Sequence, residues 1–352
     1  WDGFRFGPVL TQKDFAVDAA YPIEEFEERI VGLLGTSPNI YYRFFKDLEV
    51  DQIINSAIQK HKTAYGRSGP GLQSVKDADE MLGEFRKIKQ EQDLHNMRRA
   101  CDLSVEAHNE LMKFIKPGMN EREAEGFFNY QLLKRGAARP GYNAIMAGGP
   151  NACVLHYVFN DQTLRDGELF LVDAAGEYNY FTSDITRTYP VNGKFTAAQA
   201  EVYEAVLKVQ KAMIEMVSPG VTLQQLQDAG ASMLTDAMLE LGLFSGRKED
   251  IMAANQHKKY YPHGIGHFLG MDVHDAGMSK DRVGKNLPLE AGVILTIEPG
   301  IYIPLDDTDA AEKYRGIGIR IEDNILITQD GRANLTAACP KEISEIEALM
   351  AK

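Results

Sequence analysis

The sequence predicts an α+β protein with two related halves that follow a smaller N-terminal unit. Of its 352 residues, 44% are hydrophobic and 25% charged, which is the composition of a globular protein. Patterns of long amphipathic helices alternate with short runs of strand-forming residues. The same order of helix start and strand occurs twice along the chain. A chain of this length holds one large domain or two ordinary ones.

The charge and cysteine content exclude several classes of function. Lys and Arg number 38 against 51 Asp and Glu, a net charge of −13, which argues against sequence-independent binding to nucleic acid or anionic membranes. No run approaches the roughly 20 apolar residues of a membrane-spanning helix, so we expect no transmembrane segment. Cys101, Cys153 and Cys339 lie far apart without a C-x-x-C pair, which predicts reduced thiols in a non-oxidising compartment.

The first 80 residues differ in composition from the rest. They combine acidic runs with aromatic residues and end in His61–Asp79, a stretch that predicts a loop because it carries Gly66, Gly69, Pro70 and Gly71. This part is short for an independent domain. We therefore expect residues 1–80 to be the remnant of an N-terminal α/β domain plus linker, and residues 81–352 to be a second, larger domain. The chain begins at Trp1 without a leader pattern, which indicates a processed or truncated product.

The larger domain begins with a pair of predicted helices. Apolar residues at helical spacing predict a helix over residues 88–115, which ends at Lys116-Pro117-Gly118. Asn120 is then the predicted N-cap of the next helix, and Glu123, three residues later, is the predicted capping-box acid. The same pattern returns at Ser218-Pro219-Gly220, followed by Thr222–Gln225 at the start of another helix.

A strand pattern repeats as well. Leu164–Asp173 is similar to Leu289–Glu298, and in both a turn glycine, Gly167 or Gly292, stands six residues before a carboxylate. Two helix starts and two strands in the same order predict a duplicated domain with an acid at the same point of each half. The alternative is that turn–strand segments of unrelated origin look alike in proteins that mix helices and strands.

Four carboxylates end or interrupt apolar strands. Asp173 and Glu298 close the repeated strands, Asp184 follows shortly after the first, and Glu322 lies in the alternating run of residues 316–322 that also places Arg320 on its face. A buried carboxylate is costly unless it is paired or binds a metal. Any one of them alone is compatible with a structural ion pair, but the four together with a histidine cluster predict a metal site.

The histidine cluster lies between residues 261 and 275. His263, His267 and His274 occur there among glycines that permit close backbone approach, and His156 follows an earlier glycine loop. A glycine-flanked histidine alone is also typical of a cap or a loop. One imidazole with four carboxylates is an oxygen-rich set that suits Mn²⁺ better than a thiolate-type zinc site. Two ions roughly 3.5–4 Å apart would use all four carboxylates.

At this point the residues resemble a known ligand set. Asp173, Asp184, His267, Glu298 and Glu322 stand in the order and contexts of the five metal ligands of the pita-bread metallopeptidases, which include methionine aminopeptidase, prolidase and Xaa-Pro aminopeptidase (aminopeptidase P). The resemblance covers about residues 84–350. The motifs that favour the Xaa-Pro aminopeptidase branch are Leu155-His156-Tyr157, Ser183–Thr188, Met271–Asp275, Thr296–Tyr302 and Gly318–Asp323.

Further segments are similar to the mitochondrial members of that branch, the mitochondrial Xaa-Pro aminopeptidase and the fungal intermediate-cleaving peptidase. These segments are Gly193–Thr196, Tyr302–Gly316 and Cys339–Glu342. The resemblance implies a pita-bread catalytic domain of two pseudo-symmetric halves, a homodimer and a mitochondrial location. It implies a dimanganese-type aminopeptidase that acts on peptide or protein N-termini and removes one residue by metal-hydroxide attack.

The resemblance also implies a role for each site residue. Asp184 and Glu322 bridge two metal ions, Asp173 binds one, and His267 and Glu298 bind the other, with Glu298 also handling the proton of the hydroxide. His274 stabilises the oxyanion, and His263 and His156 contact the substrate and the leaving-group side. Arg320 and Tyr302 orient ligands and the substrate backbone, and Tyr142 lines the pocket. His156 as a core histidine, Tyr142 as plain packing and Arg320 as a neutralising charge are the alternatives.

The substrate has two main alternatives. We favour an intermediate-cleaving peptidase that trims a bulky Tyr, Leu or Phe from imported proteins after transit-peptide removal. The alternative is an Xaa-Pro aminopeptidase that strictly requires proline at the second position. Prolidase is harder to exclude than methionine aminopeptidase, which would lack the His263 position together with the Arg320-x-Glu322 strand. A metal-free creatinase-like enzyme or a binding module without activity is disfavoured because all five ligands are present.

Overall fold

The computed structural model describes residues 1, 3–65 and 72–351, and the chain divides into two compact units, Trp1–Leu82 and Gly83–Lys352. The N-terminal unit pairs two short parallel strands, β1 and β2, in the register Asn39↔Ser74 to Tyr41↔Lys76. Helices α2 and α3 pack against each other. Its elements are α1 (Gly7–Asp14), η1 (Ile23–Glu25), α2 (Phe26–Leu34), β1 (Asn39–Tyr41), α3 (Leu48–Tyr65) and β2 (Ser74–Lys76).

The predicted loop over His61–Asp79 is wrong at both of its ends. Helix α3 continues to Tyr65 with the His61 side chain buried, and β2 lies inside the stretch because its backbone pairs with β1. Gly66, Gly69, Pro70 and Gly71 lie outside the described residues. The boundary between the two units falls within α4 (Ala78–Lys87). That residues 1–80 are the remnant of a larger α/β domain stays a prediction.

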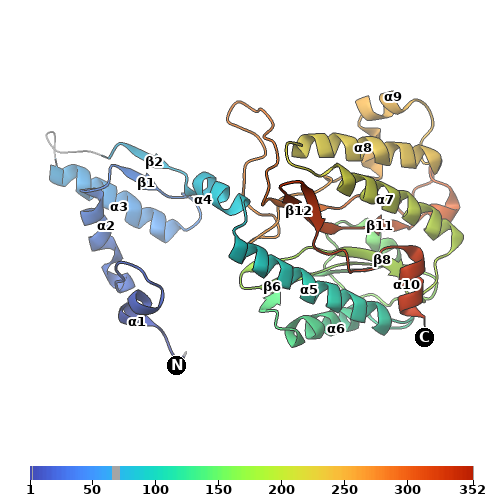
Figure 1. Cartoon of the computed structure of the whole chain (residues 1–352), viewed down its shortest axis with the longest axis horizontal. Coiled ribbons are helices and arrows are strands. Elements are labelled where there is room, and N and C mark those ends of the chain that lie inside the picture. Colours follow the sequence, from blue (N-terminus) through green and yellow to red (C-terminus); the bar gives the residue numbers. More distant parts are fainter. Residues whose placement is uncertain (2, 66–71, 352) are drawn as a thin grey trace. The chain divides into compact units, whose positions relative to one another are not determined.

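The C-terminal unit contains two helix pairs with strands between them (Figure 1). The pairs are α5 with α6 and α7 with α8, each packed against the other member. The helices are α5 (Glu91–Phe114), α6 (Glu121–Lys134), η2 (Gly149–Cys153), α7 (Ala197–Met216), α8 (Leu223–Glu240), α9 (Lys248–Ala253), η3 (Gln256–Lys259), η4 (Glu312–Tyr314) and α10 (Ile343–Met350).

The strands of this unit form small antiparallel sheets, ordered β4-β5-β8, β13-β12-β9, β3-β6-β7 and β10-β11. They are β3 (Arg139–Pro140), β4 (Ile145–Gly148), β5 (Leu169–Asp173), β6 (Gly176–Tyr178), β7 (Phe181–Thr182), β8 (Thr186–Pro190), β9 (Ile294–Ile297), β10 (Gly300–Tyr302), β11 (Gly318–Arg320), β12 (Asp323–Thr328) and β13 (Gly331–Asn334). One large apolar cluster of buried residues joins the helices of both pairs to the strands.

Hydrogen bonds repeat between the two halves of this unit. Asn120 and Thr222 both form complete capping boxes, at the starts of α6 and α8. The turn before each cap then bonds to the start of the repeated strand pattern. Gly118 and Gly220 donate their N–H groups to the carbonyls of Leu164 and Leu289, at 2.8 and 2.9 Å. These equivalent contacts between distant segments support the predicted duplication.

The alternating pattern of residues 316–322 predicts one continuous strand, and this prediction is wrong. The run divides into β11, paired with β10, and β12, paired with β9. Between them, the N–H groups of Ile321 and Glu322 bond to the carbonyls of Pro299 and Thr186, at 3.3 and 3.1 Å. The chain therefore changes sheets at this point, and Glu322 lies at the corner.

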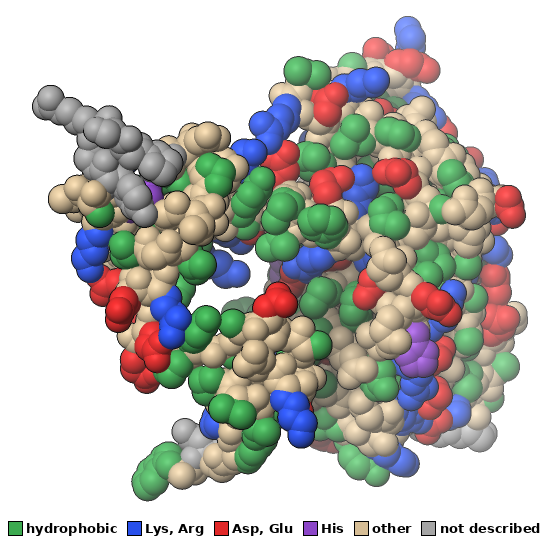
Figure 2. All heavy atoms as spheres, turned by 60° about the vertical axis from the view of Figure 1, so that its left-hand side comes forward, with side chains coloured by type: hydrophobic (Ala, Val, Ile, Leu, Met, Phe, Trp, Pro, Cys, Tyr) green, Lys and Arg blue, Asp and Glu red, His purple; other side chains and the backbone are tan. Residues whose placement is uncertain are grey.

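Charged side chains of both signs lie on the face drawn in Figure 2. On the described part of the face drawn in Figure 2, acidic and basic side chains are interspersed, so the net charge of −13 is not gathered there into a single patch. Within the described residues, no helix combines the length and the apolar character that a membrane crossing requires.

Candidate metal centre

The sequence-predicted residues meet in one cavity of about 370 Å³ inside the C-terminal unit. Residues from both halves of this unit line it, which brings together acids that lie up to 149 positions apart in the sequence (322 − 173). The predicted residues that line the cavity are His156, Asp173, Asp184, His263, His267, His274, Glu298, Arg320 and Glu322. Tyr142 and Tyr302 lie behind this lining and bond to its members.

Three of these side chains form a compact group of metal-ligand type. Asp184, His267 and Glu322 each offer one ligand atom, and the three atoms lie within 4.8 Å of one another. The Nε2 atom of His267 lies 3.4 Å from Asp184 and 3.6 Å from Glu298. Its Nδ1 atom lies 2.9 Å from the Phe268 carbonyl, so we assign the proton to Nδ1, which leaves Nε2 facing the carboxylates.

The electrostatics of this group fit a cation. Burial and the neighbouring carboxylates raise the pKa of Glu322 well above its usual range. Burial and the charges of Asp184 and Asp173 also raise the pKa of Glu298 to about 7, despite His267 and Arg320 nearby. Burial opposes charge on His267, but Asp184 and Glu298 outweigh it and raise its pKa to about 9. Without a metal the cavity thus holds protons against an excess of buried negative charge, and divalent ions would replace them.

Arg320 and Tyr142 hold the two acids of the first half. Arg320 donates from Nη2 to Asp173 at 2.7 Å and from Nε to the Thr186 hydroxyl at 3.1 Å. The Tyr142 hydroxyl lies 2.7 Å from Asp173 and 2.6 Å from Asp184. Tyr142 therefore does more than pack, and Arg320 contacts Asp173 rather than only neutralising Glu322.

His263 and Tyr302 form a second bonded pair at the cavity wall. The Nε2 atom of His263 lies 2.7 Å from the Tyr302 hydroxyl, and its Nδ1 atom lies 2.7 Å from the Gly264 carbonyl. Burial and the charge of Arg320 lower the pKa of His263 to about 3. A neutral imidazole with its proton on Nδ1 accepts from the Tyr302 O–H, whose oxygen in turn accepts from Arg320 at 3.0 Å.

His156 and His274 are the exposed histidines of the cavity. His156 is not a core histidine, which removes that alternative. The ring of His274 lies 4.4 Å from that of His267, centroid to centroid, in an edge-to-face arrangement. Burial and the charge of His267 lower the pKa of His274, which favours the neutral form of this imidazole.

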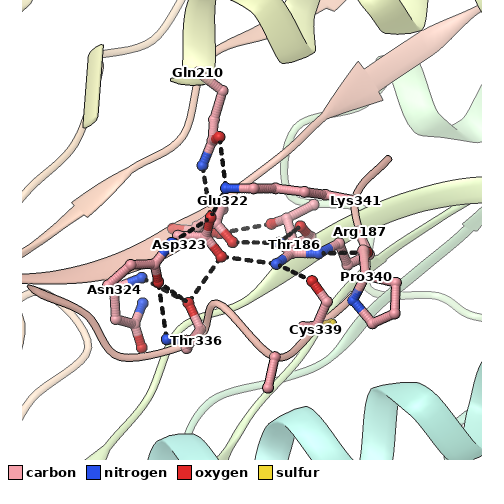
Figure 3. Close-up of polar contacts among 12 residues, drawn as sticks. Thr186, Arg187, Gln210, Glu322, Asp323, Asn324, Thr336, Cys339, Pro340 and Lys341 are labelled. Carbon is pink, nitrogen blue, oxygen red and sulfur yellow. Dashed lines mark hydrogen bonds and ion pairs between the residues drawn. The ribbon is translucent and has the colours of Figure 1, made fainter. Parts of the chain in front are cut away.

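A group of polar side chains that the sequence analysis did not single out lies around Glu322 (Figure 3). Thr186 donates to Glu322 Oε2 at 2.6 Å. The Asn324 side chain bonds to both the N–H and the carbonyl of Asp184. Arg187 and Asp323 form a fully buried ion pair at 2.7 Å. These residues lie inside or directly after the motifs Ser183–Thr188 and Gly318–Asp323, so adjacency to predicted ligands was the available signal.

The similarity of the chain to known proteins agrees with this geometry. The family described as metallopeptidase family M24 matches residues 95–329. The chain is 37% identical over 351 residues to the Xaa-Pro aminopeptidase of Escherichia coli (strain K12), covering 99% of this chain and 79% of that protein. It is 34% identical over 351 residues to the mitochondrial intermediate cleaving peptidase 55 of Arabidopsis thaliana, covering 99% of this chain and 67% of that protein.

Solved structures give the same result. Proline aminopeptidase P II from Yersinia pestis superposes with a TM-score of 0.94 at 39% identity, covering 100% of this chain and 80% of that one. The predicted α+β pita-bread fold and the resemblance to the aminopeptidase P branch are both confirmed. The chain belongs to metallopeptidase family M24 and is a metalloaminopeptidase.

Proposed function

We propose that this metalloaminopeptidase releases one N-terminal residue from peptides whose second residue is proline. The cavity lined by four carboxylates and four histidines carries the proposal, because it combines ligands, a proton acceptor and N–H donors around one space. Similarity to proteins named Xaa-Pro and proline aminopeptidase over nearly the whole chain supports the choice of substrate. Leu155 adds an apolar contact to the cavity wall beside His156, which suits a pyrrolidine ring.

Five residues would hold two divalent ions, which we propose to be Mn²⁺ because the donor set is rich in oxygen. Asp184 and Glu322 are the candidates for shared ligands. Asp173 would complete the ligands of one ion, and His267 and Glu298 would complete those of the other. When bound, the ions supply an activated water and stabilise negative charge on the substrate.

The protein's own groups divide the remaining work. Glu298, which lines the cavity, accepts the proton of the attacking water and returns it to the leaving amine. His274 donates an N–H to the oxygen on which negative charge develops. His156 and His263 contact the peptide on the leaving-group side. Arg320 and Tyr302 act as positioning residues, through Asp173 and His263.

A second candidate is trimming of a bulky residue such as Tyr, Leu or Phe from processed proteins in mitochondria. The specific observation in its favour is the match to a mitochondrial intermediate cleaving peptidase. The same match supports a mitochondrial location, whereas the bacterial relative does not. A homodimer that acts on peptide and protein N-termini completes the proposal.

The deciding experiment compares matched peptides with the Mn²⁺-loaded protein. Peptides that begin Tyr-Pro or Leu-Pro are paired with Tyr-Ala and Leu-Ser peptides of the same length, and release of the first residue is quantified. We expect release from the Pro peptides alone. Release from Ala and Ser peptides at comparable kcat/KM would establish the second candidate. If the Mn²⁺-bound protein released no residue from either set of peptides, both candidate substrate preferences would be overturned.

A further inference from the structure

The motif Cys339–Glu342 is near the C-terminal end of the chain and far in sequence from every proposed ligand. The structure nevertheless places it against Arg187 and Asp323, beside the proposed ligand Glu322 (Figure 3). Its Pro340 and Cys339 carbonyls accept hydrogen bonds from Arg187 at 3.1 and 3.0 Å. The Lys341 ammonium forms an ion pair with Asp323.

Arg187 uses all five of its N–H donors in this region. Two of these donors bond to the Pro340 and Cys339 carbonyls described above. The other three donate to Asp323 Oδ1 at 2.7 Å, to the Thr186 carbonyl at 2.9 Å and to the Glu322 carbonyl at 2.6 Å. The guanidinium is fully buried. Its planar fork fixes the angle between these groups. Arg187 therefore links the backbone of the proposed ligand Glu322 to residues 339–342, which we call the C-terminal segment.

Asp323 is the centre of the network. Its Oδ1 atom also accepts from the Thr336 hydroxyl at 2.8 Å. Its Oδ2 atom accepts from Lys341, from the Gln210 amide at 2.8 Å and from the Asn334 amide at 3.0 Å. Both cations of the network, Arg187 and Lys341, form ion pairs with this fully buried side chain. A buried carboxylate is costly unless it is paired, so removing either cation would leave Asp323 less well compensated.

The neighbouring residues connect this network to both proposed shared ligands. Thr186, next to Arg187, donates to the carboxylate of Glu322 and accepts from its N–H. Asn324, next to Asp323, binds both backbone groups of Asp184. Asp184 and Glu322 come from different halves of the duplicated unit, so their separation depends on what fixes the halves to each other at this point.

We propose that Lys341, together with Arg187 and Asp323, forms a positioning network through which the C-terminal segment sets the spacing of Asp184 and Glu322 and hence the affinity for metal. The inference rests on the proposed ligand set. Partners behind the ligands of a metal site typically change metal affinity or activity by about 10–100-fold when they are removed. Substrate binding is expected to change little, because none of the three residues lines the cavity.

The test is Lys341→Met, which removes the ammonium and keeps the length of the side chain. Mn²⁺ binding is measured by calorimetry on the metal-free full chain, without peptide. We expect the affinity for at least one of the two ions to fall by about 10-fold or more, with KM for peptide unchanged at saturating Mn²⁺. Lys341→Arg, which keeps the charge, should restore the affinity.

Lys211→Met is the matched control. Lys211 forms an exposed ion pair at 2.7 Å with Glu342, the residue after Lys341, and lies outside the network. Its loss should leave Mn²⁺ affinity unchanged. Gln210→Leu removes the amide that donates to Asp323 and accepts from Lys341 at 3.0 Å, and should weaken Mn²⁺ in the same direction, which keeps the test open if Lys341→Met fails to fold.

The outcomes separate this inference from the proposed function. Unchanged Mn²⁺ affinity in Lys341→Met and Gln210→Leu, even with a lower melting temperature, would overturn the positioning role and leave the proposed function intact. Suppose that Mn²⁺ affinity falls in both variants, but that the wild type releases no residue from any peptide. That result would support the positioning role and count against the proposed function. A wild-type chain that binds no Mn²⁺ would overturn both.

Discussion

His263 and His267 share a backbone anchor but carry opposite charge preferences. Each has Nδ1 against the carbonyl of the residue that follows it, Gly264 or Phe268. Beyond Nε2, His263 meets the Tyr302 hydroxyl and the charge of Arg320, whereas His267 meets carboxylates. The pKa of the first is lowered to about 3 and that of the second raised to about 9. The surroundings, rather than the similar glycine-flanked contexts, separate a hydrogen-bond acceptor from a candidate ligand.

His274 is expected to matter for turnover and not for metal binding. It is exposed, lies beside His267 and is not part of the compact ligand group. Removing a donor to a developing oxyanion typically lowers kcat by about 10²–10³-fold. His274→Ala should show this loss with Mn²⁺ content unchanged, as determined by elemental analysis and steady-state kinetics. A loss of bound metal would make His274 a ligand and contradict the proposed role.

His108 is expected to make the fold sensitive to acid. The imidazole is fully buried, with Nε2 at 2.8 Å from the Ala174 carbonyl, and burial lowers its pKa from 6.5 to about 4. The unfolded chain therefore takes up a proton below pH 6.5 that the folded chain refuses until about pH 4. Stability is present above pH 6.5 and falls as the pH drops towards 4, by roughly 3 kcal/mol.

The check is chemical unfolding of wild type and His108→Gln between pH 7 and pH 4. The variant lacks the titrating group, so its free energy of unfolding should fall less over this window. His95→Gln, on the exposed part of the same helix, controls for loss of an imidazole. Parallel pH profiles for wild type and His108→Gln would contradict the assignment.

At the scale of elements, the first residue of α6 organises the loop that carries His156. The buried Glu121 accepts from the Gly148 N–H at 2.8 Å, the Asn151 amide at 3.2 Å, the Tyr157 hydroxyl at 2.8 Å and the Gln162 N–H at 2.9 Å. Its position at a helix N-terminus favours the negative charge. The loop is thereby fixed at both ends and near its centre.

Glu121→Gln places an amide N–H₂ group against two of these donors, so about half of the hydrogen bonds are lost. We expect faster hydrogen exchange over residues 149–162, unchanged metal content, and a fall of about 10-fold in kcat/KM. The fall should be non-additive with His156→Ala, because both act through one loop. Glu125→Gln is the matched control, because Glu125 lies one turn later and accepts one hydrogen bond from the Asn160 amide, at 3.0 Å, among the described residues. Additive effects would show that Glu121 acts elsewhere.

The sequence predicts a structural feature well when that feature depends on a few adjacent residues. The capping boxes at Asn120 and Thr222 and the positive φ of Gly167 and Gly292 follow from a few adjacent residues, and the structure has all of them. The division of residues 316–322 between β11 and β12 does not. Periodicity describes one continuous strand, whereas the partners that end it, Pro299 and Thr186, lie elsewhere in the sequence.

At the scale of the whole molecule, metal is expected to join the two halves. Asp173 and Asp184 belong to the first half, and His267, Glu298 and Glu322 to the second. Ions that bind the folded state alone stabilise it by about 2.7 kcal/mol at a concentration of 100 times Kd. Removing Mn²⁺ with a chelator should therefore lower the melting temperature by several degrees, and added Mn²⁺ should restore it.

Calorimetry of the full chain with and without chelator measures this effect. Asp184→Asn, which removes one charge of the compact ligand group, should show a smaller shift between the two conditions. An equal melting temperature with and without Mn²⁺ in the wild type would mean that the ion does not link the halves.

The sequence by itself determined the family, because its ligand motifs resemble those of known members. It also predicted the duplicated halves, because strand ends, caps and turn glycines are encoded by near neighbours. Through the same resemblance it predicted the carboxylates, the histidines and the arginine that line the cavity. The tertiary structure alone decided how these residues are held. The Arg187–Asp323–Lys341 network joins positions up to 154 residues apart (341 − 187), and Tyr142 meets both Asp173 and Asp184 across separate segments. Such contacts have no period and no fixed spacing. They form only when the fold brings distant segments together, because each polar group that becomes buried then requires a hydrogen-bond partner.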